Sequence, residues 1–109
     1  MEFEEYQRRA ARTSNPTLTA EQRLLDAAAG LSEEAGEVLG ALRKHLFQGK
    51  PLDLPAMRLE LGDALWCLSA VAGALGVSLG EVAEENLAKL QARYPEGVTP
   101  RRAPAPPES

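Results

Sequence analysis

The sequence contains little cysteine, histidine or aromatic residue, and each shortage excludes a class of site or fold. Its 109 residues include a single cysteine, Cys67, so an intrachain disulfide is impossible and nothing indicates an oxidising compartment. One cysteine and one histidine, His45, do not provide the ligand spacing of a zinc site. Aromatic residues make up 5% of the chain, whereas alanine, leucine and glutamate are abundant, which favours helices over sheets.

Long apolar runs and an excess of positive charge are also missing. The longest apolar stretch, ALWCLSAVAGALGV at 64–77, is interrupted by Ser69 and Gly73, so we expect a buried helix and not a membrane span. The net charge of −4 argues against a broad basic surface for a nucleic-acid polymer. The N-terminal MEFEEYQRRA has no apolar segment, so we expect no signal peptide. We therefore expect a cytoplasmic protein with neither a nucleic-acid nor a membrane partner.

The residues that are present predict one all-α domain over residues 1–97. Helices are expected at about 2–13, 20–47, 53–75 and 79–93, because apolar residues recur there with helical period. Capping residues support these boundaries: Thr19, Asp53 and Ser78 would begin helices, and Gly76 would end one. Residues 98–109 are rich in proline, which predicts a mobile tail. A core of this size is modest, so we also expect an oligomer.

Acidic side chains occupy matching positions on the second and third expected helices. On the helix at 20–47, Glu34 borders the apolar stripe, Glu37 lies on the adjoining stripe and Glu33 lies further out. On the third helix, Glu60 borders the apolar stripe and Asp63 stands about one turn away. Antiparallel packing of the two stripes would bring four of these carboxylates together at one side of the seam: Glu34, Glu37, Glu60 and Asp63.

Converging carboxylates repel one another, and burial raises their pKa values, so such a cluster calls for a cation. A ligand set made only of carboxylates suits a hard divalent ion, Mg²⁺ first and Mn²⁺ next. A di-iron centre would need Glu-x-x-His on a helix, but Leu42 stands three residues before His45. The alternative is a solvated acidic face with local ion pairs, and the residues alone do not decide between the two.

Three blocks of sequence, GLSEEAGEV, ELGDALW and NLAKLQARYP, occur in this order and together resemble the MazG-like all-α nucleoside triphosphate pyrophosphohydrolases. The resemblance extends from YQRRAART at 6–13 to RYPEG at 93–97. It implies a four-helix-type bundle assembled as a homodimer or homotetramer. It also implies hydrolysis of a nucleoside triphosphate to the monophosphate and pyrophosphate.

The resemblance implies roles for the acidic residues. Glu34, Glu37, Glu60 and Asp63 match the magnesium-ligand positions, with magnesium neutralising the charge between carboxylates and triphosphate. Glu33 matches the first residue of the Glu-Glu-x-x-Glu motif. Glu37 and Glu33 are the candidates for the group that takes the proton from the attacking water.

The expected substrate-binding residues are mostly polar side chains of the last helix. The positions that match the family's motif there are Asn86, Lys89, Arg93 and Tyr94. Lys44 lies on the Glu37 side of the second helix and is a further candidate for binding phosphate, with Lys50 a weaker candidate. For the base, Tyr6 and Phe47 could form walls, whereas Trp66 is interpreted as a packing residue.

Two other functions fit the sequence. A helical bundle of the same shape could bind a nucleotide or a partner protein without catalysis. A helical interaction protein could work through its first helix or its tail. The complete set of four acids favours the enzyme, because a pure binding module would not need it.

Overall fold

The computed structural model describes residues 1–97, and the expected proline-rich tail at 98–109 lies outside the described residues. Residues 1–97 form four α-helices and no β-strand: α1 (Phe3–Ala11), α2 (Ala20–Gln48), α3 (Leu54–Ala74) and α4 (Leu79–Arg93). The predicted all-α class is confirmed, and every helix end falls within about two residues of its expected position. The domain boundary at residue 97 stays a prediction.

Side-chain caps begin three of the helices, as predicted. Thr19 Oγ1 accepts the Gln22 N–H at 3.1 Å, and Gln22 Oε1 accepts the Thr19 N–H at 2.9 Å, which completes a capping box. Asp53 and Ser78 cap α3 and α4, each accepting a backbone N–H three residues ahead. Gly76 follows α3 with a φ of 72°, a left-handed conformation that glycine adopts without strain. Each side-chain cap typically contributes about 1 kcal/mol.

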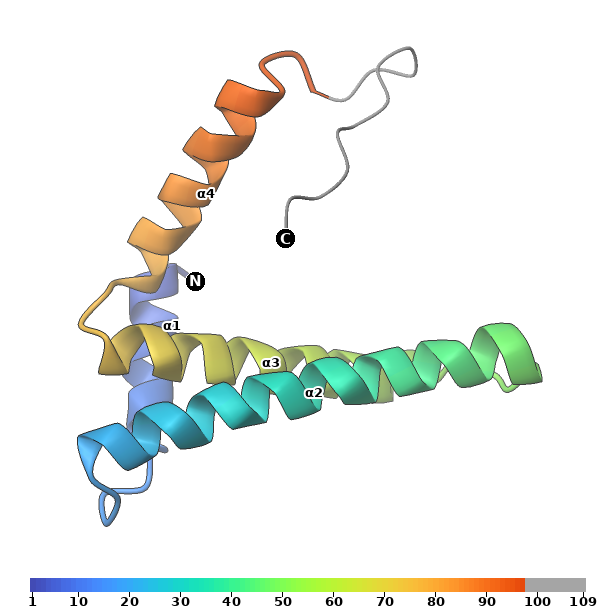
Figure 1. The fold of residues 1–109 in the computed structure, drawn as a ribbon, viewed down its shortest axis with the longest axis horizontal. Helices are drawn as coiled ribbons and strands as arrows, with labels where there is room; N and C mark the ends of the chain where they lie inside the picture. Colours follow the sequence, from blue (N-terminus) through green and yellow to red (C-terminus); the bar gives the residue numbers. More distant parts are fainter. Residues whose placement is uncertain (98–109) are drawn as a thin grey trace.

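The two long helices α2 and α3 form an antiparallel hairpin, and the short helix α1 crosses one end of it (Figure 1). Helix α4 rises from this same end, where it packs against α1 and α3 but does not contact α2. The opposite end of the hairpin carries the α2–α3 loop and is covered by no other helix of residues 1–97.

The seam of the hairpin is tight where Gly30 faces Cys67. A Cβ atom added at Gly30 would lie 2.9 Å from Cys67 Sγ, so only glycine permits this approach. The cysteine is buried, and this burial, reinforced by nearby carboxylates, raises the pKa of its thiol. The lone cysteine is therefore a protonated packing residue that joins α2 to α3.

Gln7 ties α1 to the turn between α3 and α4. Its Nε2 donates to the Val77 carbonyl at 3.0 Å and to the Ser69 carbonyl at 3.5 Å. Its Oε1 accepts the backbone N–H of Leu79, the first residue of α4, at 2.9 Å. One side chain therefore satisfies three backbone groups and fixes the direction in which α4 leaves the hairpin.

Most of the predicted apolar stripe on α2 and α3 is open to solvent in the single chain. The buried apolar residues of the described chain are Ala27, Cys67, Ala72 and Leu79. Large side chains along the hairpin are exposed, among them Leu39, Leu46, Leu54, Leu59, Leu61 and Leu75. The expectation that the third helix is buried on most sides is wrong for the single chain, because α1 and α4 cover only one end of the hairpin.

The described chain is correspondingly extended. Its radius of gyration is 16.9 Å, whereas a compact chain of about 100 residues has a value of about 13 Å. The four helices therefore do not close into a bundle within one chain, and the apolar faces of α2, α3 and α4 remain available to a partner.

Within residues 1–97, none of the helices combines the length and the hydropathy needed to cross a membrane by itself. Helices α3 and α4 meet both criteria only when taken together, and the chain bends by 102° between them.

Candidate active site

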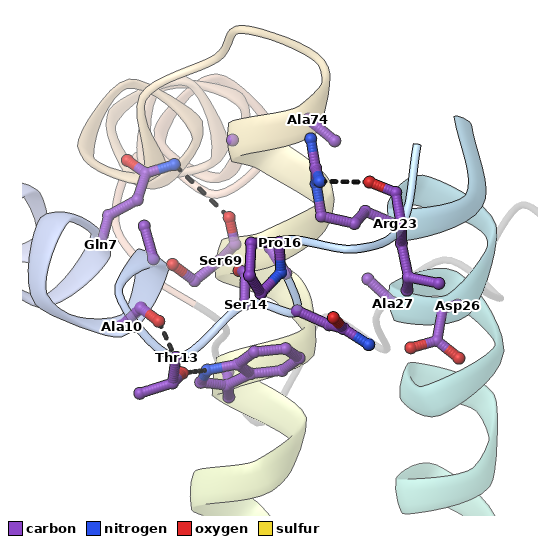
Figure 2. A pocket seen from close by; sticks show the side chains of 16 residues that line it. Gln7, Ala10, Thr13, Ser14, Pro16, Arg23, Asp26, Ala27, Ser69 and Ala74 are labelled. Atoms are coloured by element: carbon purple, nitrogen blue, oxygen red, sulfur yellow. Dashed lines mark hydrogen bonds between the residues drawn. The ribbon is translucent and has the colours of Figure 1, made fainter. Parts of the chain in front are cut away.

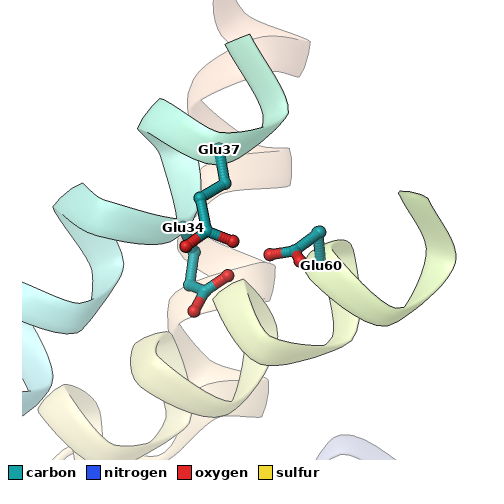
Figure 3. A group of neighbouring side chains, drawn as sticks. All are labelled: Glu34, Glu37 and Glu60. Carbon is teal, nitrogen blue, oxygen red and sulfur yellow. The ribbon is translucent and has the colours of Figure 1, made fainter. Parts of the chain in front are cut away.

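Three carboxylates meet across the middle of the α2–α3 hairpin. Glu34 and Glu37 come from α2 and Glu60 from α3, and their side chains point toward one another (Figure 3). One oxygen of each lies within 4.8 Å of the chosen oxygens of the other two. The spacing of three residues places Glu34 and Glu37 on consecutive turns of one helix face. The structure therefore brings together three of the four predicted metal ligands.

The crowding raises the pKa of two of these carboxyl groups. For Glu37 the largest cause is hydrogen bonding with Glu60, which requires a protonated acid, followed by Coulombic repulsion from Glu60. The pKa of Glu60 is also raised, first through hydrogen bonding with Glu34, although its bond with Glu37 acts in the opposite direction. A group of carboxylates whose members favour protonation is a group that favours any bound positive charge.

Two oxygen atoms of the group also lack a partner that a bound cation would supply. Oε2 of Glu34 and Oε2 of Glu60 are shielded from solvent and have no hydrogen-bond partner among the described residues. Buried polar atoms without a partner are rare and costly in folded proteins. No arginine or lysine supplies the charge, since the ion pair found within residues 1–97 is Arg9–Glu5 on α1. The donor set, all oxygen and all anionic, fits a hard divalent cation.

Asp63 and Glu33 stand outside this group of three. Both side chains are exposed, and neither contributes an oxygen to the cluster. The charge of Asp63 nevertheless adds to the raised pKa of Glu37, after the effects of Glu60 and of burial. Burial, and then the charge of Asp63, also raise the pKa of Tyr6 on α1. The charge of Asp63 therefore acts on both the cluster and Tyr6. Its role as a ligand stays a prediction, as does that of Glu33 as a base.

Two cavities lie on either side of the carboxylates along α2. A cavity of about 590 Å³, here the α1 cavity, is lined by α1, the α1–α2 loop and the adjoining faces of α2 and α3 (Figure 2). A cavity of about 420 Å³, here the loop cavity, lies toward the α2–α3 loop and includes Glu37 and Glu60 in its wall. Arg23 and Ala27 line the first and Ala41 lines the second, at spacings that keep them on one stripe of α2 with the carboxylates.

The α1 cavity has an aromatic wall and several polar groups. Trp66 lines it, and the indole Nε1 donates to Thr13 Oγ1 at 2.7 Å. Thr13 Oγ1 in turn donates to a backbone carbonyl of α1 at 2.7 Å, which fixes the orientation of the indole. Asn15 and Asp26 add polar atoms to the lining. Apolar surface with a few polar groups is typical of small-ligand sites, and Trp66, which we expected to be a packing residue, lies in the wall of this one.

The other two predicted aromatic walls are not part of this cavity. Phe47 is 82% exposed near the far end of α2. Tyr6 lies on α1 close to Asp63 but does not line the α1 cavity.

The predicted substrate-binding residues separate into two groups. Lys44 lines the loop cavity beside the carboxylates. The residues in and directly after α4 line neither the loop cavity nor the α1 cavity: Asn86, Lys89, Arg93 and Tyr94. The Arg93 guanidinium instead lies over the Tyr94 ring, 5.9 Å from its centroid. Since α4 does not contact α2, a single chain does not bring these residues to the carboxylates.

The sequence made Lys50 a weak candidate and gave His45 no role in the site. In the structure Lys50 lines the loop cavity, and His45 contacts Lys50. Lys50 lines the cavity with Lys44. His45 Nδ1 lies 2.8 Å from the carbonyl oxygen of Lys50. The signal that could have found them is Gly49, a helix-ending glycine whose φ of 67° turns the chain back over the end of α2.

The fold and the site define a helical-hairpin protein with a central acidic group suited to a divalent cation. The chain belongs to the MazG nucleotide pyrophosphohydrolase domain family, whose model matches residues 22–98. The resemblance seen in the three sequence blocks is thereby confirmed, and the matched segment contains all three clustered carboxylates.

One relative of the chain is the "Gene 37 protein" of Mycobacterium phage L5. It is 40% identical over 76 residues, which cover 63% of this chain and 64% of that protein. The chain thus spans a little under two thirds of the relative's length, and the relative's name states no activity. No solved structure matches the chain.

The raised pKa values predict how the metal-free protein responds to pH. The pKa values of Glu37 and Glu60 are higher in the folded chain than the ordinary value of 4.5 that they have in the unfolded chain. Their contribution to the free energy of unfolding is therefore favourable in acid and is lost as pH rises from about 4.5 through the raised values. We expect Glu60→Gln to raise the melting temperature of EDTA-treated protein at neutral pH, by an amount that shrinks on acidification. Melting curves of both proteins across this range test it, and a difference independent of pH would contradict it.

Proposed function

We propose that this chain hydrolyses a nucleoside triphosphate to the nucleoside monophosphate and pyrophosphate, with Mg²⁺ or Mn²⁺ as cofactor. The observation that carries the proposal is the group Glu34, Glu37 and Glu60, with two shielded oxygens lacking a partner and a cavity on each side. Asp63 is the fourth proposed ligand. Membership in a family described as nucleotide pyrophosphohydrolases supports the reaction class.

The protein's contribution is to hold acidic groups in place before the substrate arrives. Once bound, the cation supplies charge neutralisation for the phosphates and lowers the pKa of a water molecule. The packing of α2 on α3 fixes the carboxylates in one position, so little reorganisation is needed. Glu37, whose pKa is raised, or the exposed Glu33 accepts the proton of the attacking water. The α1 cavity, with Trp66 in its wall, accommodates the nucleoside.

We propose that the active form of the protein is a homodimer or homotetramer. Exposed leucines along α2 and α3 form an apolar surface that a second copy would cover. Leu46, for example, is 71% exposed and Leu59 is 73% exposed. Assembly would also bring Lys89 and Arg93 of α4 close to the carboxylates of another subunit. They do not reach those of their own hairpin, because α4 does not contact α2.

The test is a pyrophosphate-release assay with a panel of canonical and modified nucleoside triphosphates. We expect at least one substrate to give equal amounts of monophosphate and pyrophosphate, with a loss of at least about a hundredfold when EDTA removes the metal. Release of diphosphate and inorganic phosphate would contradict the proposed bond cleavage. Tight nucleotide binding with no turnover of any substrate would favour the non-catalytic binding bundle instead.

A further inference from the structure

The loop cavity contains two lysines whose charges no carboxylate neutralises directly. Lys44 and Lys50 both line it, together with Asp53 and two members of the acidic group. Among the described residues, no carboxylate oxygen lies within 4.0 Å of either ammonium group. Cations and anions thus share about 420 Å³ without pairing, and both remain free to bind a third group.

The chain reverses direction at the end of α2, so that the backbone of Lys50 contacts that of Lys44. The N–H groups of Gly49 and Lys50 both donate to the carbonyl of Lys44, the second at 3.2 Å. Gly49 adopts the left-handed conformation that this reversal needs. The chain therefore folds back over the last turn of the helix, which places the two lysines at one cavity.

His45 secures this arrangement from the same turn of α2. Its Nδ1 lies 2.8 Å from the Lys50 carbonyl oxygen. A carbonyl oxygen can only accept a hydrogen bond, so Nδ1 carries the proton and donates. His45 is accordingly a positioning residue for Lys50.

The two cavities beside the carboxylates differ in chemistry. The α1 cavity combines the Trp66 indole with alanines, and its arginine, Arg23, already donates to the Leu18 carbonyl at 2.6 Å. The loop cavity offers two lysines, which serve phosphate groups as compact point charges. A nucleoside triphosphate has a flat, weakly polar base at one end and a polyanionic phosphate chain at the other. The base therefore suits the α1 cavity, and the phosphate chain suits the loop cavity.

We propose that Lys44 and Lys50 bind the β- and γ-phosphates, so that the pyrophosphate product leaves from the loop cavity while the nucleoside occupies the α1 cavity. The inference rests on the proposed function and adds the direction of the substrate. The α–β anhydride bond then lies at the carboxylates. Water cleaves that bond, its oxygen enters one of the two products, and one proton is released to the accepting carboxylate.

Binding of the two products separately tests this direction without requiring turnover. Calorimetric titration with inorganic pyrophosphate in Mg²⁺ buffer is compared for the wild type, Lys44→Gln and Lys50→Gln. We expect each variant to weaken pyrophosphate binding about tenfold and to change nucleoside monophosphate binding by less than about twofold. Arg58→Gln is the matched control, because Arg58 is exposed on α3 and does not line the loop cavity.

The role of His45 has its own readout. His45→Ala is expected to weaken pyrophosphate binding about threefold, with no further loss when Lys50→Gln is present. His45→Asn should restore the affinity, since its amide can donate from nearly the position of Nδ1. A merely structural histidine would lower the melting temperature without changing the ratio of the two product affinities.

The outcomes separate this inference from the reaction itself. Unchanged pyrophosphate binding in both lysine variants, or an equal loss for both products, overturns the direction even if the wild type hydrolyses triphosphates. If the wild type hydrolyses none but binds pyrophosphate through both lysines, the reaction falls and the assignment of the lysines to an anionic phosphate group stands.

Discussion

Replacing Glu34 with glutamine is expected to reduce pyrophosphate release at least about a hundredfold while raising the stability of the metal-free protein. The loss follows from removing one of the proposed metal ligands from the group with Glu37 and Glu60. The gain follows because the glutamine amide can donate to Glu60 Oε2, which has no partner in the described chain. Relief of repulsion acts in the same direction.

Turnover with Mg²⁺ and melting curves in EDTA measure the two effects on the same preparation. We expect the melting temperature to rise by a few degrees, the shift that about 1 kcal/mol produces in a domain of this size. Glu21→Gln is the control, since it removes the same charge from an exposed position in the first turn of α2. Unimpaired turnover in Glu34→Gln would remove the proposed site. Reduced activity together with reduced stability would indicate a folding role.

If α4 serves the carboxylates of another subunit, as the proposed oligomer requires, mixing two inactive variants is expected to restore activity. One variant carries Glu34→Gln, and the other carries Lys89→Met with Arg93→Met. Helix α4 does not contact α2 of its own chain, so the cations must come from a neighbour if they act on the phosphates at all. Each mixed dimer has one intact site of two, so purified mixed dimers are expected to have about half of wild-type activity.

Co-expression with two different affinity tags, followed by purification through both, isolates the mixed oligomers for assay. Light scattering establishes that they are oligomers. The matched control pairs Glu34→Gln with Glu60→Gln, which cannot complement because both residues belong to one hairpin. Mixed oligomers that stay inactive in the first pairing would show that α4 does not act across subunits.

The local features of this fold could be predicted because each depends on neighbouring residues. Thr19, Asp53 and Ser78 cap helices through bonds that span three residues, which the sequence displays directly. The meeting of Glu34 with Glu60 needed one further assumption, antiparallel packing of consecutive helices, and a short loop between them makes that packing the usual outcome.

The features that sequence reasoning missed depend on contacts between distant segments. Helical periodicity identified an apolar face that includes Leu46 and Leu61 but not what covers it, and within residues 1–97 both side chains are exposed. The position of Lys50 depends on a left-handed glycine and a hydrogen bond to His45, to which periodicity is blind. Trp66 was judged by its apolar character alone, whereas its bond to Thr13 turns it toward a cavity.

The scarcity of interior residues has a thermodynamic consequence. Among residues 1–97 only small side chains and Leu79 are enclosed, so if the chain assembles as we propose, its folding is coupled to its association with another copy. Protein concentration then acts as a stabilising agent in its own right, and dilution alone shifts the population toward unfolded chains. The cell's supply of this polypeptide would thereby set both the number of folded molecules and the fraction of chains that fold.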